Sequence, residues 1–90
     1  MTPLLDEIAK PKILVVDDDQ LVCDVLCNMI NVLGFEVDSC HEAPEASALL
    51  SKPDYGLALI DIKLGDVNGF DVLREVNYRT PDLQIIMISG

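Results

Sequence analysis

The segment Ile13-Leu14-Val15-Val16-Asp17-Asp18-Asp19 decides the fold. Four apolar residues in succession are typical of a strand that is buried on both faces of a sheet. Three carboxylates follow where this strand would end, and in open α/β sheets ligands bind at the carboxyl ends of the strands. Two carboxylates ~4 Å apart repel each other by about 4 kcal/mol at an effective dielectric constant of roughly 20. The segment therefore either lowers stability at the end of this strand or provides a cation site there.

Outward from this segment, strand patterns and helix patterns alternate along the chain. Three more apolar or alternating runs predict strands, and three runs with apolar spacings of three and four predict helices. The strands are expected at 12–17, 35–40, 55–60 and 83–88, and the helices at 20–33, 44–50 and 70–78. This β-α-β-α-β-α-β order with short connections predicts an α/β fold, a parallel sheet with helices on its faces. Residues 1–11 are expected to be a lead-in to one domain that spans 12–90.

Local signals mark the ends of these elements. Asp19 has the character of a helix N-cap, and Gly34 is expected to end the first helix in a left-handed conformation. The segment 63–68 contains Gly65 and Asp66 and is expected to be a loop. In the helix that follows, Phe70, Leu73 and Val76 are expected to point inward.

The charge of the chain excludes several classes of partner. Six basic and 16 acidic residues give a formal net charge of −10, which disfavours direct binding to nucleic acid or to anionic membranes. No apolar stretch has membrane-spanning length. The cysteines number three, lack metal-site spacing and predict a reduced, cytoplasmic protein with small buried thiols.

Polar residues follow three of the predicted strands. Asp17 and Asp18 follow the first strand, Asp61 the third and Ser89 the fourth, and parallel strands bring their carboxyl ends to one edge. Oxygen ligands of this kind suit Mg²⁺. A carboxylate beside a metal ion can also attack phosphorus and form an aspartyl phosphate. His41 can approach this edge, but we expect a solvated loop histidine because the sequence shows no partner for it.

Three segments together resemble the signature of the response-regulator receiver domain: 13–19 (ILVVDDD), 57–69 (LALIDIKLGDVNG) and 85–90 (IIMISG). The resemblance implies a three-layer flavodoxin-like fold with strand order 2-1-3-4, and phosphorylation by a sensor histidine kinase or phosphotransfer protein. It implies that Asp61 is the phosphoacceptor and that Ser89 is the residue that binds the phosphoryl group and switches. It further implies that Mg²⁺ is held by Asp17, Asp18, Asp61 and the backbone carbonyl of Lys63. Gly69 matches the glycine that precedes the third helix of the family.

The chain departs from the family pattern in two ways. Gly65 stands where the family often has proline, and Asn68-Gly69 replaces Asp-Gly. The 90 residues also end before the fifth strand, its phosphate-binding lysine and the last two helices, and no residue matches that lysine. The fourth strand then becomes an apolar, uncharged edge. We therefore expect self-association through this edge and the uncovered sheet face, or else a fragment of a longer response regulator.

Other classes of function compete with a phosphoacceptor. A non-phosphorylated, receiver-like interaction module fits the same sequence, and indifference to Mg²⁺ would favour it. An aspartate-nucleophile phosphatase is disfavoured because such sites resemble Asp-x-Asp, whereas residue 63 is lysine. A dinucleotide-binding fold is disfavoured because no GxGxxG follows the first strand. We expect no turnover enzyme, only metal-assisted self-phosphorylation and slow self-dephosphorylation.

Overall fold

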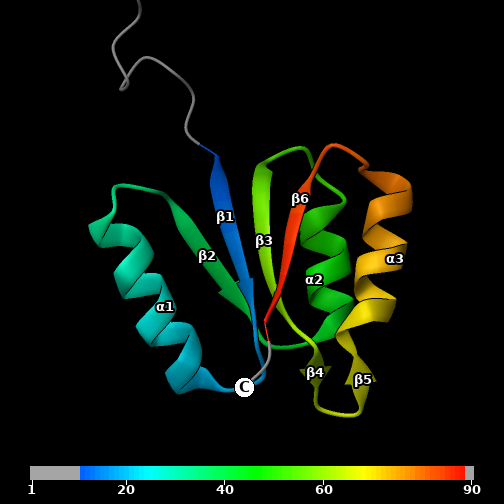
Figure 1. Ribbon diagram of the computed structural model, residues 1–90, viewed down its shortest axis with the longest axis horizontal. Coiled ribbons are helices and arrows are strands. Elements are labelled where there is room, and N and C mark those ends of the chain that lie inside the picture. The colour runs from blue at the N-terminus through cyan, green and yellow to red at the C-terminus, as the bar shows by residue number, and fades with distance from the viewer. Residues whose placement is uncertain (1–10, 89–90) are drawn as a thin grey trace, which may run out of the picture.

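The computed structural model describes residues 11–88 and divides them into three long helices and a series of strands (Figure 1). The elements in chain order are β1 (Lys12–Val16), α1 (Gln20–Val32), β2 (Val37–Cys40), α2 (Ala43–Leu50), β3 (Tyr55–Asp61), β4 (Lys63–Leu64), β5 (Val67–Asn68), α3 (Gly69–Arg79) and β6 (Gln84–Ile88). The predicted lead-in up to residue 10 and the predicted site residue Ser89 lie outside the described residues. Within 11–88, no helix has both the length and the apolar character needed to cross a membrane.

The four longer strands form one parallel sheet in the order β2-β1-β3-β6, which confirms the predicted α/β fold and strand order. In the sheet register Val16 pairs with Cys40 on one side and with Ile60 on the other. Asp61 pairs with Ile88. The register therefore brings the ends of all four strands to the same edge, which is the lower edge in Figure 1.

Two predicted helix boundaries are confirmed, and one predicted loop is wrong. The Asp19 side chain accepts hydrogen bonds from the amides of Leu21 and Val22, and Gly34 adopts a φ of 93° after α1. The segment 63–68, expected as a loop, is a small antiparallel hairpin. Gly65 has a φ of 59° and lets the chain reverse between β4 and β5, while Leu64 of β4 is buried in the core.

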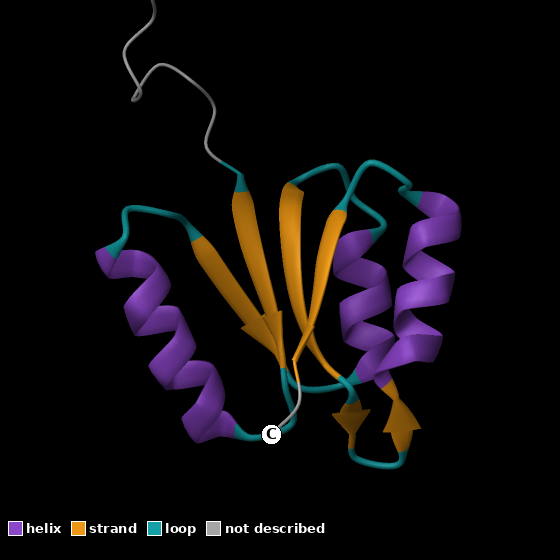
Figure 2. Ribbon diagram, in the orientation of Figure 1, coloured by secondary structure: helices purple, strands orange, loops and turns teal. Residues whose placement is uncertain are grey.

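Alternation along the strands divides the core into two layers, one on each face of the sheet (Figure 2). On one face Leu14, Val16 and Ile60 pack against α2 and α3. On the other face Ile13 and Val15 pack against α1. β1 is thus buried on both faces, as its continuous apolar run predicts.

The prediction that Phe70 of α3 points inward is wrong. Phe70 keeps 43% of its surface exposed, whereas Val72 and Val76 are buried and Leu73 is half-buried. α3 begins at Gly69, so that Gly69, Val72 and Val76 share one face at spacings of three and four. Phe70 is one residue, or about 100°, away from that face.

The layer formed by α1 covers only part of its face of the sheet. The buried residues of α1 are Cys23 and Ile30, and the helix lies over β1 and β2. Leu21, Val25 and Met29 are between 49% and 70% exposed, although the sequence pattern places them with the apolar residues of this helix. On β6, Ile86 is 50% exposed. At 100° per residue, Leu21, Val25 and Met29 lie on the face of α1 opposite Cys23 and Ile30, so this stripe points away from the sheet. The half-exposed Ile86 lies on the sheet face where α1 covers β1 and β2.

A polar cluster ties three strands together at a distance from the carboxyl edge. The Tyr55 hydroxyl donates a 2.6 Å hydrogen bond to Asp38, and the Lys12 ammonium lies 3.0 Å from the same carboxylate oxygen. These two donors, with that of Tyr55 the stronger, hold the pKa of Asp38 below its ordinary value. The cluster therefore favours the charged form of Asp38 in the folded chain.

Replacing Tyr55 by phenylalanine is expected to lower the free energy of unfolding by about 1 kcal/mol at neutral pH. The folded-state pKa of Asp38 is depressed, so its contribution is complete above the unfolded-state pKa of about 3.9 and is lost as the pH falls below that value. Urea unfolding at several pH values should show a difference between the two chains that shrinks below about pH 4. Tyr78→Phe is the control because Tyr78 is 90% exposed. A difference that grows in acid contradicts the prediction.

Candidate functional site

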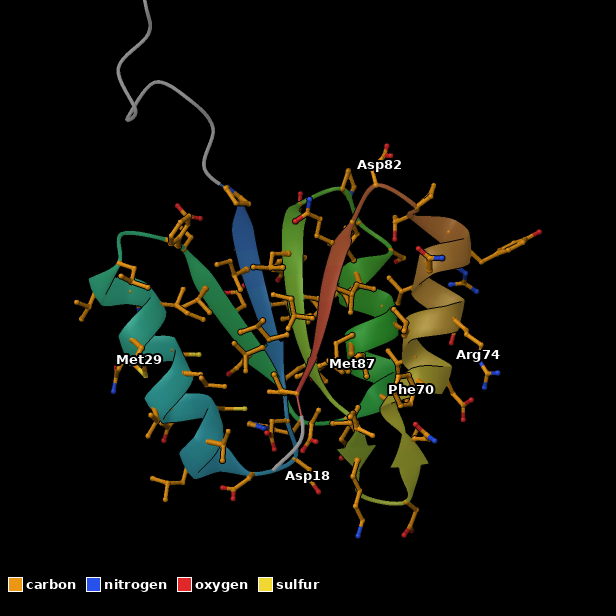
Figure 3. All side chains as sticks on the ribbon, viewed as in Figure 1. Asp18, Met29, Phe70, Arg74, Asp82 and Met87 are labelled. Carbon is orange, nitrogen blue, oxygen red and sulfur yellow. The ribbon has the colours of Figure 1, made fainter. Side chains whose placement is uncertain are left out.

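Three carboxylates meet at the carboxyl edge of the sheet. Asp17 and Asp18 follow β1, and Asp61 is the last residue of β3. One carboxylate oxygen from each of the three lies within 4.8 Å of the others. Figure 3 shows Asp18 at this edge, with Asp82 at the opposite end of the sheet. The predicted meeting of these acids is therefore present in the structure.

Asp17 is the buried member of the group, with an exposed fraction of 5%. Its burial raises the pKa of its carboxyl group, and the neighbouring charges of Asp61 and Asp18 raise it further. A hydrogen bond from the amide of Asp19, 2.9 Å from Asp17 Oδ1, opposes this shift. A divalent cation would relieve both the desolvation and the repulsion, and hard cations prefer oxygen ligands of this kind. The three acids thus fit a divalent metal ion.

The chain that follows β3 supplies backbone donors to the other two acids. The amide of Lys63 donates a 3.1 Å hydrogen bond to Asp61 Oδ1, and the amide of Gly65 donates one of 3.1 Å to Asp18 Oδ2. The β4–β5 hairpin therefore links the end of β3 to the end of β1. Sequence reasoning missed this role of Gly65 because a backbone donor leaves no trace in residue type.

The backbone of Gly69, the first residue of α3, lies against the backbone at the end of β3. Its amide donates a 2.6 Å hydrogen bond to the carbonyl of Ile62. A Cβ at this position would overlap the backbone carbonyl oxygen of Asp61 and would lie 3.1 Å from the Cα of Ile62. Only glycine fits this approach of α3 to the end of β3.

The family model for the response regulator receiver domain matches residues 13–90. The chain belongs to the response regulator receiver domain family. Receiver domains of this family are signalling domains that interact with histidine kinases or phosphotransfer proteins. The family assignment therefore confirms the resemblance seen in the three signature segments.

Relatives and solved structures agree with this family. The alginate biosynthesis regulatory protein AlgB of Pseudomonas aeruginosa is 30% identical over 79 residues, covering 88% of this chain and 18% of AlgB. The photosynthetic apparatus regulatory protein RegA of Cereibacter sphaeroides is 29% identical, covering 91% of this chain and 45% of RegA. A CheY-like receiver domain from Methanospirillum hungatei superposes with a TM-score of 0.86 at 33% identity, covering 91% of this chain and 66% of that one. The receiver domain described here thus spans less than half the length of either regulator.

The environment of His41 in this receiver domain differs from the prediction. His41 is predicted to be a solvated loop histidine, but it is half-buried and its Nδ1 lies 2.9 Å from the carbonyl oxygen of Asp17. The contact joins residues 24 positions apart, so no short-range pattern reveals it. The available signal was topological: His41 directly follows β2, whose end lies beside the end of β1.

A shallow pocket of about 450 Å³ opens beside Asp18, between the start of α2 and the hairpin. His41 and Asp18 line it on one side, and the hairpin residues Gly65 and Asp66 line it on the other.

All three cysteines are free thiols, as expected, with Cys23 and Cys40 buried.

Proposed function

We propose that this receiver domain accepts a phosphoryl group on Asp61 from a sensor histidine kinase or a phosphotransfer protein. Mg²⁺ would be held by Asp17, Asp18, Asp61 and the backbone carbonyl of Lys63. The observation that supports the proposal most strongly is the meeting of three carboxylate oxygens within 4.8 Å at the end of β1 and β3. Family membership supports the phosphoacceptor role of Asp61. We propose a cytoplasmic location, where such kinases present their phosphohistidine.

The geometry of Asp61 suits an attacking carboxylate. Asp61 is half-buried, and the Lys63 amide fixes its Oδ1. Among residues 11–88 no described hydrogen bond reaches the other oxygen, which is therefore available to attack phosphorus. The transfer forms a P–O bond to Asp61 and breaks the P–N bond of the donor, whose imidazole takes up a proton. When bound, Mg²⁺ supplies positive charge that offsets the phosphoryl oxygens. Ser89, which follows Ile88 in the chain, would donate its hydroxyl to the phosphoryl group.

Incubation with acetyl phosphate and MgCl₂ is expected to add one phosphoryl group to the chain, seen by intact-mass spectrometry. Asp61→Asn should abolish the adduct, because an amide is a far weaker nucleophile than a carboxylate. EDTA should suppress it as well. Asp66→Asn is the matched control, since Asp66 is exposed on the same hairpin and lies outside the three-carboxylate group. An adduct of equal yield on Asp61→Asn, or none on the wild-type chain, contradicts the proposal.

A second candidate function is an interaction module that associates with itself. The observation that favours it is the half-exposed Ile86 of β6, on the sheet face where α1 packs over β1 and β2. Within the described residues β6 has a neighbour on one side only, and its residues carry no charge. An uncharged open edge promotes pairing between strands of different chains. We propose that two copies pair through β6, with or without phosphorylation.

A further inference from the structure

The backbone carbonyl of Asp17 receives two side-chain donors from different elements. His41 Nδ1 lies 2.9 Å from this oxygen, and Cys23 Sγ lies 3.4 Å from it. A carbonyl oxygen only accepts, so Nδ1 of His41 carries the proton that it shares in this contact. Burial raises the pKa of the Cys23 thiol to about 11, so the thiol keeps its proton at neutral pH. The 3.7 Å approach of Sγ to Nδ1 is therefore a contact between two donors that share one acceptor.

The amide and the carboxylate of Asp17 also make hydrogen bonds. Its amide donates a 3.2 Å hydrogen bond to the carbonyl of Cys40, the residue before His41. Its carboxylate accepts from the amide of Asp19. Asp17 is thus held at its amide, its carbonyl and its carboxylate, and two of these contacts come from the end of β2. His41 is the strong side-chain donor on the carbonyl, because a thiol donates only weakly.

We propose that His41 is a positioning residue of this site: by donating to the carbonyl of Asp17, it holds the Asp17 carboxylate toward Asp18 and Asp61. This inference rests on the proposed function, because it assigns a role toward the metal ion of that site. His41 lies in the connection between β2 and α2 and touches none of the three carboxylates through a described hydrogen bond. The imidazolium and the Nδ1–H form of the neutral ring both donate, so the contact persists whichever of these His41 adopts.

Removing the histidine should therefore weaken the metal site more than the fold. His41→Ala leaves the Asp17 carbonyl with only the weak thiol donor of Cys23. Residues that orient metal ligands change metal affinity by 10- to 100-fold when they are replaced. His41 acts through the backbone of Asp17, so we expect a loss of about tenfold, at the lower end of that range.

The decisive comparison is between asparagine and glutamine at position 41. The side-chain amide nitrogen of asparagine occupies the place of Nδ1 in histidine, whereas that of glutamine lies one carbon farther along. In a titration of ¹⁵N-labelled chain with MgCl₂, followed by amide NMR, His41→Asn should restore most of the affinity that His41→Ala loses. His41→Gln should not. Ser39→Ala, at an exposed position of β2, should bind as the wild-type chain does. The thermal midpoint of each variant is measured alongside, because a purely structural role lowers it without separating asparagine from glutamine in affinity.

The imidazole ¹⁵N spectrum gives a readout that does not require the metal. The neutral ring should be protonated at Nδ1 in the folded chain. A ring protonated at Nε2, or equal Mg²⁺ affinity of wild type and His41→Ala, overturns the inference, as does equal rescue by glutamine and asparagine. A wild-type chain that does not bind Mg²⁺ contradicts the proposed function, and the positioning role falls with it even where the imidazole spectrum shows the contact.

Discussion

Replacing Gly69 by alanine is expected to destabilise the receiver domain by about 3 kcal/mol and to abolish Mg²⁺ binding at low millimolar concentrations. The added Cβ would overlap the carbonyl oxygen of Asp61, which is backbone and cannot rotate away. Either α3 or the end of β3 must then move. Moving β3 displaces the Asp61 carboxylate from Asp17 and Asp18, whereas moving α3 breaks the hydrogen bond from the Gly69 amide to Ile62. Both routes disturb the core and the site together.

Gly65→Ala is the matched control, because it adds the same methyl group four residues earlier, in the hairpin that leads to Gly69. Gly65 has a φ of 59°, but no atom lies within 4 Å of the place where its Cβ would be. The cost is then limited to the left-handed backbone conformation, about 1 kcal/mol. The Gly65 amide would still donate to Asp18. Urea unfolding and amide NMR titration with MgCl₂ measure both effects. Similar losses for the two variants would show that backbone conformation, and not the overlap with Asp61, determines the effect.

Much of this fold could be predicted because short-range patterns determine it. The apolar run of β1 fixes a strand that is buried on both faces, and Asp19 and Gly34 mark the two ends of α1. Alternation of strands and helices then implies a parallel sheet. A parallel sheet places Asp17, Asp18 and Asp61 at one edge without any knowledge of distances. The principal elements of the site follow from topology alone.

The errors arose where long-range packing decides between local alternatives. The spacing of apolar residues in α3 allows either Phe70 or Val72 to face inward, and the close approach of Gly69 to Asp61 selects Val72. The contact of His41 with the Asp17 carbonyl depends on the register of β1 with β2, which no residue type encodes. The stripe of Leu21, Val25 and Met29 is exposed because the packing of α1 selects the opposite face, with Cys23 and Ile30, for the core. Sequence periodicity shows that a face is apolar but does not show what covers it.

The 90-residue chain is expected to form dimers that Ile86→Lys converts to monomers. β6 has an open edge in the described structure, and Ile86 is half exposed on the sheet face where α1 packs over β1 and β2. Two copies of Gln84–Ile88 can pair in antiparallel orientation about a two-fold axis, which satisfies their free backbone groups and opposes no charges across the edge. The net charge of −10 opposes association overall, so pairing should strengthen as salt screens that repulsion. Size-exclusion chromatography with light scattering, at several protein and salt concentrations, measures the mass.

A lysine at position 86 opposes pairing because antiparallel pairing of residues 84–88 about their centre places the two copies of residue 86 opposite each other, and like charges directly opposite are destabilising. Tyr78→Lys adds the same charge at a residue that is 90% exposed on α3, on the opposite face of the sheet, and should leave the dimer intact. A wild-type chain that stays monomeric at every concentration removes the proposed pairing, and equal disruption by both lysines would assign it to net charge and not to β6. Neither variant changes the three carboxylates, so Asp61 should accept a phosphoryl group in the monomer as in the dimer. Association and phosphorylation are therefore separable properties of this chain, and the two lysine variants distinguish them.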